Sequence, residues 1–245
     1  MRGKGTRKRT RNTAPTSKAG LKSTGAKNSK KQRTSQTQTE AERAQVEHVD
    51  LSSGDIGENA DVWMIGDSII HWAGERAKQR GRENLRLPGD RTVRWLTIRG
   101  MKWQDFHHVI QRERLFCTPP KAIVLHLGGN DLRTWSLYKL RRVINKEIKY
   151  LYECFPDTIV IWYDILQRRN WDGCYKENVA MEKKRRRVNY FGRKAVTARS
   201  QGRTLETQID FATAGFYRGD GIHLSEVGLE MFLDSLRDGL INYMG

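Results

Sequence analysis

The sequence predicts an α/β domain from about Asp61 to Gly245, in which helices cover both faces of a parallel β-sheet. Patterns typical of strands and of helices alternate along this region. Two segments, Lys121–Leu127 (KAIVLHL) and Thr158–Leu166 (TIVIWYDIL), are nearly continuous apolar runs, as expected of parallel strands buried on both faces. Between them, apolar residues recur every three or four positions, which predicts an amphipathic helix.

The first part of the domain is expected to contain two strands and two helices. The strands are predicted at Val62–Gly66 and Val93–Arg99, and the helices at Ile69–Arg80 and Trp103–Leu115. The amphipathic helix that follows Lys121–Leu127 has an apolar face of Leu137, Leu140, Ile144, Ile148, Leu151 and Phe155. It should end before Pro156, because proline cannot continue a helix.

The last part of the domain supplies two more helices and a fifth strand. Tyr175–Ser200 is very basic and is predicted to be helical, with a break near Gly192 because glycine weakens helices. Thr204–Phe211 is predicted as the fifth strand. Ser225–Met244 is predicted as a closing helix with an apolar stripe of Leu229, Phe232, Leu236 and Leu240.

Residues 1–60 are predicted to be a disordered basic arm and linker that precede the domain. From Met1 to Thr39 there are twelve Lys or Arg and no Asp or Glu. This segment therefore carries most of the net charge of +17 of the whole chain. Such a segment cannot bury enough apolar surface to offset the entropy of ordering its backbone. A dense basic block can bind nucleic-acid phosphates, or it can be a solvated tail that aids solubility.

Other features of the sequence bear on the cellular compartment of the protein. The basic start is not followed by the apolar run of a secretory signal, and no stretch approaches the roughly 18 consecutive apolar residues of a membrane span. The three cysteines, Cys117, Cys154 and Cys174, lie far apart and form no metal-binding pattern, which suggests reduced thiols. We therefore expect an intracellular protein, cytoplasmic or nuclear.

Ligands of open parallel sheets bind beyond the carboxyl ends of the strands, so the loops at those ends are where chemistry is expected. The first such loop contains Gly66-Asp67-Ser68. A serine at a helix N-terminus lies near free backbone N–H groups that favour negative charge. The same residues would also serve as an ordinary helix N-cap.

Two further strand-end loops are rich in glycine. Gly100 follows the second strand, and Gly129-Asn130-Asp131 follows the most apolar strand. Glycine lets the backbone approach a ligand closely, and an asparagine amide can donate a hydrogen bond. The alternative is that these residues simply form turns.

A fourth loop, Asp220-Gly221-Ile222-His223, precedes the closing helix. A carboxylate three residues ahead of a histidine can accept the Nδ1 proton, which leaves Nε2 free to act as a base for a serine. A histidine in such a place can equally be structural.

These four loops, taken in order, resemble the blocks of the SGNH hydrolase superfamily, also called the GDSL esterase/lipase family. Gly66-Asp67-Ser68-Ile69 corresponds to the nucleophile block, with Ile in place of the usual Leu. Gly100 matches the glycine of the second block, Gly129-Asn130-Asp131 ends the third, and Asp220-Gly221-Ile222-His223 forms the fourth.

The resemblance implies a flavodoxin-like three-layer sandwich with a five-stranded parallel sheet. It implies ester hydrolysis with Ser68 as nucleophile, His223 as base and Asp220 as the residue that orients the base. The oxyanion hole would comprise the backbone N–H groups of Ser68 and Gly100 and the side chain of Asn130. No metal or organic cofactor is required. Asp67 is interpreted as a structural residue, and four other histidines, His71, His107, His108 and His126, as structural or surface residues.

The leading hypothesis is a serine esterase that acts on short acyl esters such as acetyl esters, because no long apolar insertion is present to form an acyl tunnel. The competing hypothesis is a nucleic-acid-binding accessory protein that uses the hydrolase fold as a scaffold; a flavodoxin-like signalling domain is a third. A basic arm before such an esterase also resembles proteins encoded by vertebrate retroelements. In that case residues 1–39 and Lys183–Arg187 (KKRRR) would contact RNA or DNA, unless KKRRR is only the solvated face of a helix.

Overall fold

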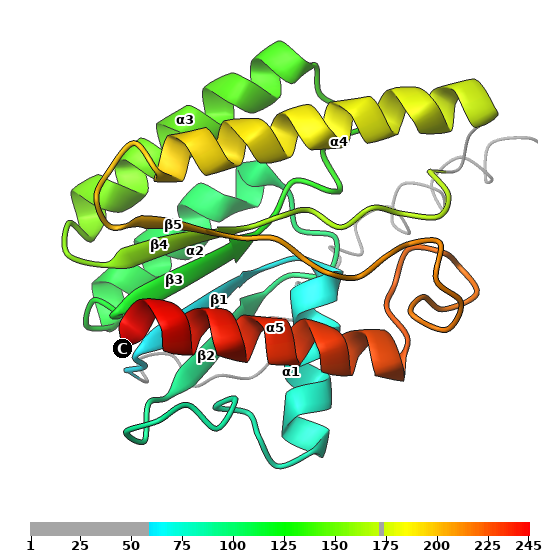
Figure 1. The fold of residues 1–245 in the computed structure, drawn as a ribbon. Coiled ribbons are helices and arrows are strands. Elements are labelled where there is room, and N and C mark those ends of the chain that lie inside the picture. Colours follow the sequence, from blue (N-terminus) through cyan, green and yellow to red (C-terminus); the bar gives the residue numbers. More distant parts are fainter. Residues whose placement is uncertain (1–58, 172–173) are drawn as a thin grey trace, which may run out of the picture. The chain divides into compact units, whose positions relative to one another are not determined.

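Five parallel strands form one sheet in the computed structural model, which describes residues 59–171 and 174–245 (Figure 1). The strands are β1 (Val62–Gly66), β2 (Val93–Thr97), β3 (Ala122–His126), β4 (Ile159–Tyr163) and β5 (Gly202–Leu205). Their order across the sheet is β2-β1-β3-β4-β5, and every neighbouring pair is parallel. The predicted five-stranded parallel sheet with flavodoxin-like order is therefore confirmed.

Helices cover both faces of this sheet. They are α1 (Ser68–Gln79), α2 (Trp103–Phe116), α3 (Leu137–Cys154), α4 (Tyr175–Val196) and α5 (Glu226–Met244). One hydrophobic cluster joins the sheet to α2, α3 and α4, and a second cluster joins it to α1 and α5. The predicted three-layer α/β sandwich is confirmed, and in the part of the chain that the structure describes no helix could span a bilayer.

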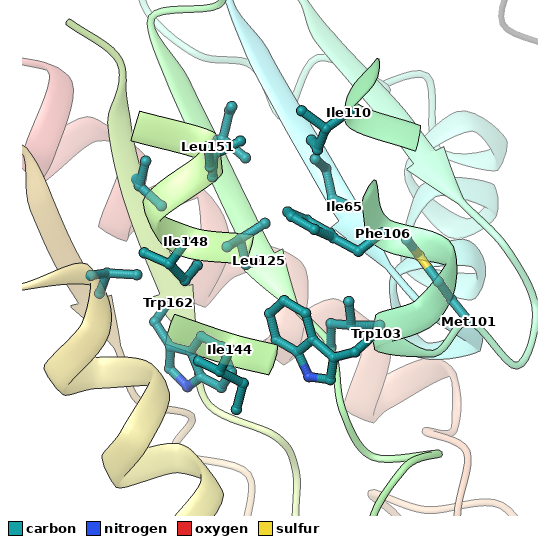
Figure 2. Close-up of a cluster of buried hydrophobic side chains, with 14 of the residues drawn as sticks. Ile65, Met101, Trp103, Phe106, Ile110, Leu125, Ile144, Ile148, Leu151 and Trp162 are labelled. Carbon is teal, nitrogen blue, oxygen red and sulfur yellow. The ribbon is translucent and has the colours of Figure 1, made fainter. Parts of the chain in front are cut away.

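Alternation along the strands explains why their sequences read as continuous apolar runs. In β1, Trp63 and Ile65 belong to the cluster under α2–α4, while Val62 and Met64 belong to the other. Successive side chains of a strand point to opposite faces, and here both faces are covered. Figure 2 shows side chains of the first cluster, most of which come from β1, β3, β4, α2 and α3.

The predicted break near Gly192 is wrong, because α4 is continuous from Tyr175 to Val196. Gly192 is buried, and a Cβ placed on it would lie only 2.2 Å from the indole of Trp162 in β4. The glycine therefore lets the helix pack closely on the sheet, and its helical conformation is imposed by that packing.

The fifth strand was predicted too late in the chain. It comprises Gly202–Leu205 instead of Thr204–Phe211, and Ile209 is buried in a loop. A strand can extend only as far as the neighbour with which it pairs. The Asp164 N–H still donates to the Leu205 carbonyl, but the next N–H, that of Ile165, donates to the Asn189 side chain of α4. β4 thus leaves the sheet, and β5 has no partner beyond that point.

The strand order places a topological switch point at the carboxyl ends of the central strands. Gly66, the last residue of β1, pairs with Thr97 of β2 on one side and with His126 of β3 on the other. The connections after β1 and β3 therefore leave the same edge at the position where the strand order reverses, the usual ligand site of open α/β sheets. The basic arm at 1–39 lies outside the described residues, and the domain division at residue 60 stays a prediction.

Candidate active site

The structure brings Ser68, His223 and Asp220 together at this edge. Ser68 Oγ lies 3.0 Å from His223 Nε2, although the two residues are 155 positions apart in the sequence. His223 Nδ1 lies 2.7 Å from Asp220 Oδ2. The two contacts use opposite nitrogens of one imidazole. With a proton on Nδ1, Nε2 is a free base directed at the serine hydroxyl.

The Asp220 carboxylate is held by several donors. Its Oδ1 accepts hydrogen bonds from the backbone N–H groups of Ile222 and His223, at 2.8 and 2.9 Å. Partial burial alone would raise the pKa of Asp220, but the His223 ring and the two N–H groups stabilise the anion and lower the pKa to about 2. Asp220 is therefore an anion at any pH near neutrality.

The segment after β4 fixes the loop that carries this pair. Arg169 N–H donates to the Gly221 carbonyl at 2.8 Å, and the Tyr217 hydroxyl donates to the Gln167 carbonyl at 2.5 Å. Gly221 has a φ of +67°, and a Cβ on it would meet the Arg169 side chain. The requirement for glycine at this position is thus both conformational and steric.

Ser68 is the first residue of α1, which follows β1 after a single intervening residue, Asp67. Asp67 is buried, and its Oδ1 caps the helix by accepting a hydrogen bond from Ile69 N–H at 3.0 Å. At this position the Ser68 N–H has no acceptor within the helix. It is available to a negatively charged oxygen.

Asn130 lies next to the serine loop and is bonded to it. Its Nδ2 donates to Asp67 Oδ2 at 3.2 Å and to the Met101 carbonyl at 3.3 Å. Gly100 lies in the turn after β2, with a φ of +78° and open space where a Cβ would be. All residues expected at the site therefore come from loops at one edge of the sheet, and Asn130 contacts both the first and the second loop.

Sequence reasoning missed Arg168, which follows β4. Its Nη2 donates to Asn130 Oδ1 at 3.2 Å, and its guanidinium lies 4.8 Å from the centre of the Trp171 ring. The first contact fixes which side of the Asn130 amide carries the oxygen, so Nδ2 is directed toward Asp67 and the serine loop. No motif in the sequence marks this arginine; only its place in the loop that follows a strand could have suggested it.

Comparisons with solved structures agree with the fold described above. A Streptococcus pneumoniae protein provisionally described as a platelet activating factor is 21% identical, with a TM-score of 0.60 over 75% of this chain and 85% of that chain. A GDSL-like lipase from Bacteroides thetaiotaomicron is 13% identical, with a TM-score of 0.54 over 78% and 91% of the respective chains. The chain has the SGNH hydrolase fold.

The SGNH fold alone does not select a reaction. The OSK domain of Drosophila Oskar, whose description names no hydrolase, has a TM-score of 0.54 at 14% identity over 81% of this chain and 99% of that domain. No protein-family model and no curated protein matches the sequence. At these identities the comparisons establish the fold, and the predicted retroelement origin stays a prediction.

Asp131, the last residue of the third SGNH block, is completely buried. Its Oδ2 accepts a hydrogen bond from the N–H of Trp103, the first residue of α2, at 3.2 Å. Its Oδ1 has no hydrogen-bond partner among the described residues. Burial raises the pKa of Asp131 to about 7, although the Trp103 N–H and the Lys102 ammonium oppose the rise. Burial thus favours the protonated carboxyl at pH values where an ordinary aspartate is ionised.

The remaining histidines in the described part of the chain occupy varied surroundings. His71 Nδ1 lies 3.4 Å from the Thr97 hydroxyl, and His108 is exposed. His126 is buried, and burial lowers its pKa, so its imidazole is neutral. His107 has an acidic partner, because its Nδ1 lies 2.9 Å from Glu147 Oε2 on α3. None of these contacts involves Ser68.

The KKRRR run is largely engaged with the protein itself. Lys184 donates to backbone carbonyls of the loop before α3, and Arg185 binds Glu182 and the Ile165 carbonyl. Arg186 also pairs with Glu182. Two of the five cations, Lys184 and Arg185, thus tie α4 to neighbouring loops, whereas Arg186 pairs within the helix. No cluster of His, Cys, Asp or Glu in the described ranges could hold a metal ion.

Proposed function

We propose that this protein is a serine esterase that hydrolyses short-chain carboxylic esters, such as acetyl esters, through an acyl-Ser68 intermediate. The observation that carries the proposal is the pair of hydrogen-bonding distances on either side of the His223 ring, 3.0 Å to Ser68 Oγ and 2.7 Å to Asp220 Oδ2. A nucleophile, a base and an oriented carboxylate in this arrangement are what acyl transfer requires.

In the first step, Ser68 Oγ attacks the ester carbonyl carbon while His223 Nε2 takes the hydroxyl proton. The C=O electron pair moves to the carbonyl oxygen, which becomes an oxyanion. Asp220 stays ionised and stabilises the imidazolium, since its pKa of about 2 lies far below neutral pH. The oxyanion then collapses, the C–O bond to the alcohol breaks, and the imidazolium gives its proton to the departing alkoxide.

In the second step, water replaces the alcohol. His223 Nε2 removes a proton from water as the oxygen attacks the acyl carbon, and a second oxyanion forms. Its collapse breaks the bond to Ser68 Oγ, which regains the proton from the imidazolium. The products are a carboxylic acid, an alcohol and the unchanged enzyme.

The proposed oxyanion hole comprises the N–H groups of Ser68 and Gly100 and the Asn130 amide. Both Asn130 Nδ2 contacts are long, 3.2 and 3.3 Å, so a developing oxyanion can displace the Met101 carbonyl as acceptor. The contact with the Asp67 carboxylate would then keep the amide in place. Loss of one such donor typically lowers the rate by about 100- to 1,000-fold.

The proposal of a short acyl group rests on the surroundings of the site. β1 passes into α1 through Asp67 alone, and the loops that follow β4 and precede α5 carry Arg168, Arg169 and Arg218. These loops carry charged side chains and contain no long apolar segment that could enclose a long acyl chain.

The test is hydrolysis of p-nitrophenyl acetate by the full chain, with Ser68→Ala, His223→Ala and, as a matched control, His108→Ala at an exposed position on α2. The wild type and His108→Ala should turn over at similar rates, whereas the two site variants should lose roughly 10⁴-fold or more in kcat. A fluorophosphonate should label the wild type at Ser68 and leave Ser68→Ala unmodified. Octanoate esters should react more slowly than acetate esters.

The scaffold hypothesis makes the opposite prediction. If the folded wild type, Ser68→Ala and His223→Ala all match the buffer rate across the ester series and none is labelled, the esterase assignment is wrong. The hydrolase fold would then serve another purpose.

A further inference from the structure

A groove between α3 and α4 combines basic and aromatic side chains. Figure 1 shows the two helices side by side, and a hollow of about 330 Å³ opens between them. We call it the α3–α4 groove. Its rim carries four exposed cations, Arg141, Lys149, Lys194 and Arg199. A hollow of this size lies at the lower end of the range of roughly 300–1,000 Å³ that small-ligand pockets occupy.

The charge around the groove is not neutralised locally. α3 and α4 together contain thirteen Lys or Arg and four Asp or Glu, a net charge of +9. Among the described residues, Arg141, Lys194 and Arg199 form no ion pair. The opposite layer differs, because Arg76, Arg80 and Arg82 near α1 all pair with acidic residues of α5. A concentration of uncompensated positive charge therefore marks the α3–α4 face.

The floor of the groove is apolar and aromatic. Ile148 and Tyr152 are buried beneath it, and Figure 2 shows Ile148 within the packed core. Phe191 is half-buried at the side, and the Arg141 guanidinium lies 5.8 Å from its ring centre. Next to Phe191 in the sequence, Tyr190 is 57% exposed. In such a surface the cations can bind phosphates, and the accessible aromatic rings can stack on bases.

We propose that the α3–α4 groove binds single-stranded nucleic acid, with one base held against Phe191 and the flanking phosphates on Arg141, Lys194 and Arg199. Arg141 and Lys149 are two helical turns apart, about 12 Å along α3 at 1.5 Å per residue. The cations can therefore follow more than one phosphate of a strand. A base inserted into the hollow must be unstacked and unpaired, which favours a single strand over a duplex.

The groove and the candidate active site lie at opposite edges of the sheet. Arg199 N–H donates to the Val196 carbonyl, and Gly202, the first residue of β5, donates to the Arg199 carbonyl. The end of α4 thus lies where β5 begins, at the amino edge, whereas Ser68 and His223 lie beyond the carboxyl ends of the strands. Binding in the groove does not depend on the esterase proposal, and groove variants should keep esterase activity.

The test is fluorescence anisotropy of a labelled 20-nucleotide single-stranded RNA with the full chain, measured from 50 to 200 mM salt. The groove variant is Arg141→Gln/Lys194→Gln/Arg199→Gln. The matched control, Lys78→Gln/Arg86→Gln/Arg237→Gln, removes the same charge from exposed positions elsewhere. The groove variant should bind at least about tenfold more weakly, and its slope of log K against log salt should fall by about 2, since each phosphate contact on a single strand contributes about 0.7. The control should bind nearly as the wild type does.

Two further measurements separate base binding from charge alone. Phe191→Leu should weaken RNA binding by about fivefold or more while leaving the salt slope unchanged, because stacking is not electrostatic. Photo-crosslinks from 4-thiouridine RNA should map to the peptides around Tyr190 and Phe191. The proposal is overturned if crosslinks map only to residues 1–39, or if the groove and control variants lose affinity equally. The proposal is also overturned if duplex RNA binds as tightly as single-stranded RNA. It is likewise overturned if anionic phospholipid vesicles bind as tightly as the single strand and Phe191→Leu has no effect.

Discussion

Asp67 Oδ2 accepts a hydrogen bond from Asn130 Nδ2 at 3.2 Å, which ties the residue before the candidate nucleophile to the loop after β3. The other oxygen of the same carboxylate caps α1 through Ile69 N–H. The structural role predicted for Asp67 is thus supported and extended, because one buried side chain holds both the serine and a proposed oxyanion donor.

This double role predicts that Asp67→Ala affects stability and activity together. Loss of a helix N-cap typically costs about 1 kcal/mol in the free energy of unfolding. Release of Asn130 should in addition lower kcat by about 10- to 100-fold. Ser136→Ala is the matched control, because Ser136 caps α3 through Lys139 N–H, and α3 contributes no residue to the site. Urea unfolding and ester hydrolysis would be measured for both variants, and an unchanged kcat in Asp67→Ala would refute the link.

Arg168 is predicted to act through Asn130 as a positioning residue. Arg168→Met removes the donor to Asn130 Oδ1 and should lower kcat by about tenfold, as the amide can then rotate. The decisive measurement is a double-mutant cycle with Asn130→Ala. If Arg168 works only through the amide, the second substitution has no further effect on kcat once Asn130 is gone. Additive losses would instead indicate that Arg168 contacts the substrate directly.

Much of the fold was predictable because its determinants are local in the sequence. Strands buried on both faces must be apolar throughout, so Lys121–Leu127 and Thr158–Leu166 could be identified directly. The contact between Asp220 and His223 spans only three residues. The carboxyl-edge rule then brought four separate loops to one place without any knowledge of distances.

The failures come from contacts between distant parts of the chain. The end of β5 depends on where β4 leaves the sheet. The raised pKa of Asp131 depends on its burial beside the start of α2. Arg168 has a role only because Asn130, 38 positions away, lies beside it. Such relationships leave no periodic pattern or short motif in the sequence.

For Gly192 the structure predicts a change in stability opposite to the one that helix propensity alone predicts. In an exposed helix, Gly→Ala would stabilise by up to about 1 kcal/mol. Here the new methyl would overlap the Trp162 ring, so Gly192→Ala should instead lower the free energy of unfolding by about 2 kcal/mol or more. Urea unfolding monitored by circular dichroism measures the change. A variant more stable than the wild type would show that α4 can move away from β4 at little cost.

Asp131 predicts a specific dependence of stability on pH. Its ordinary pKa is 3.8, and the folded protein raises it to about 7. Between these values the folded protein keeps a proton that the unfolded chain has released. The contribution of Asp131 to the free energy of unfolding is therefore largest at low pH. It declines as the pH rises through this window and is constant above about pH 7. The full change is on the order of 4 kcal/mol, at about 1.4 kcal/mol per pKa unit.

Asp131→Asn tests this dependence because the amide can still accept the Trp103 N–H but cannot ionise. The difference in the free energy of unfolding between Asp131→Asn and the wild type should grow in favour of the variant from pH 5 to pH 8. Burial lowers the pKa of His126 and changes stability in the opposite direction, but it does so in both proteins and cancels in the difference. A difference that is constant with pH would mean that Asp131 is ionised throughout, with water or a displaced loop solvating its Oδ1.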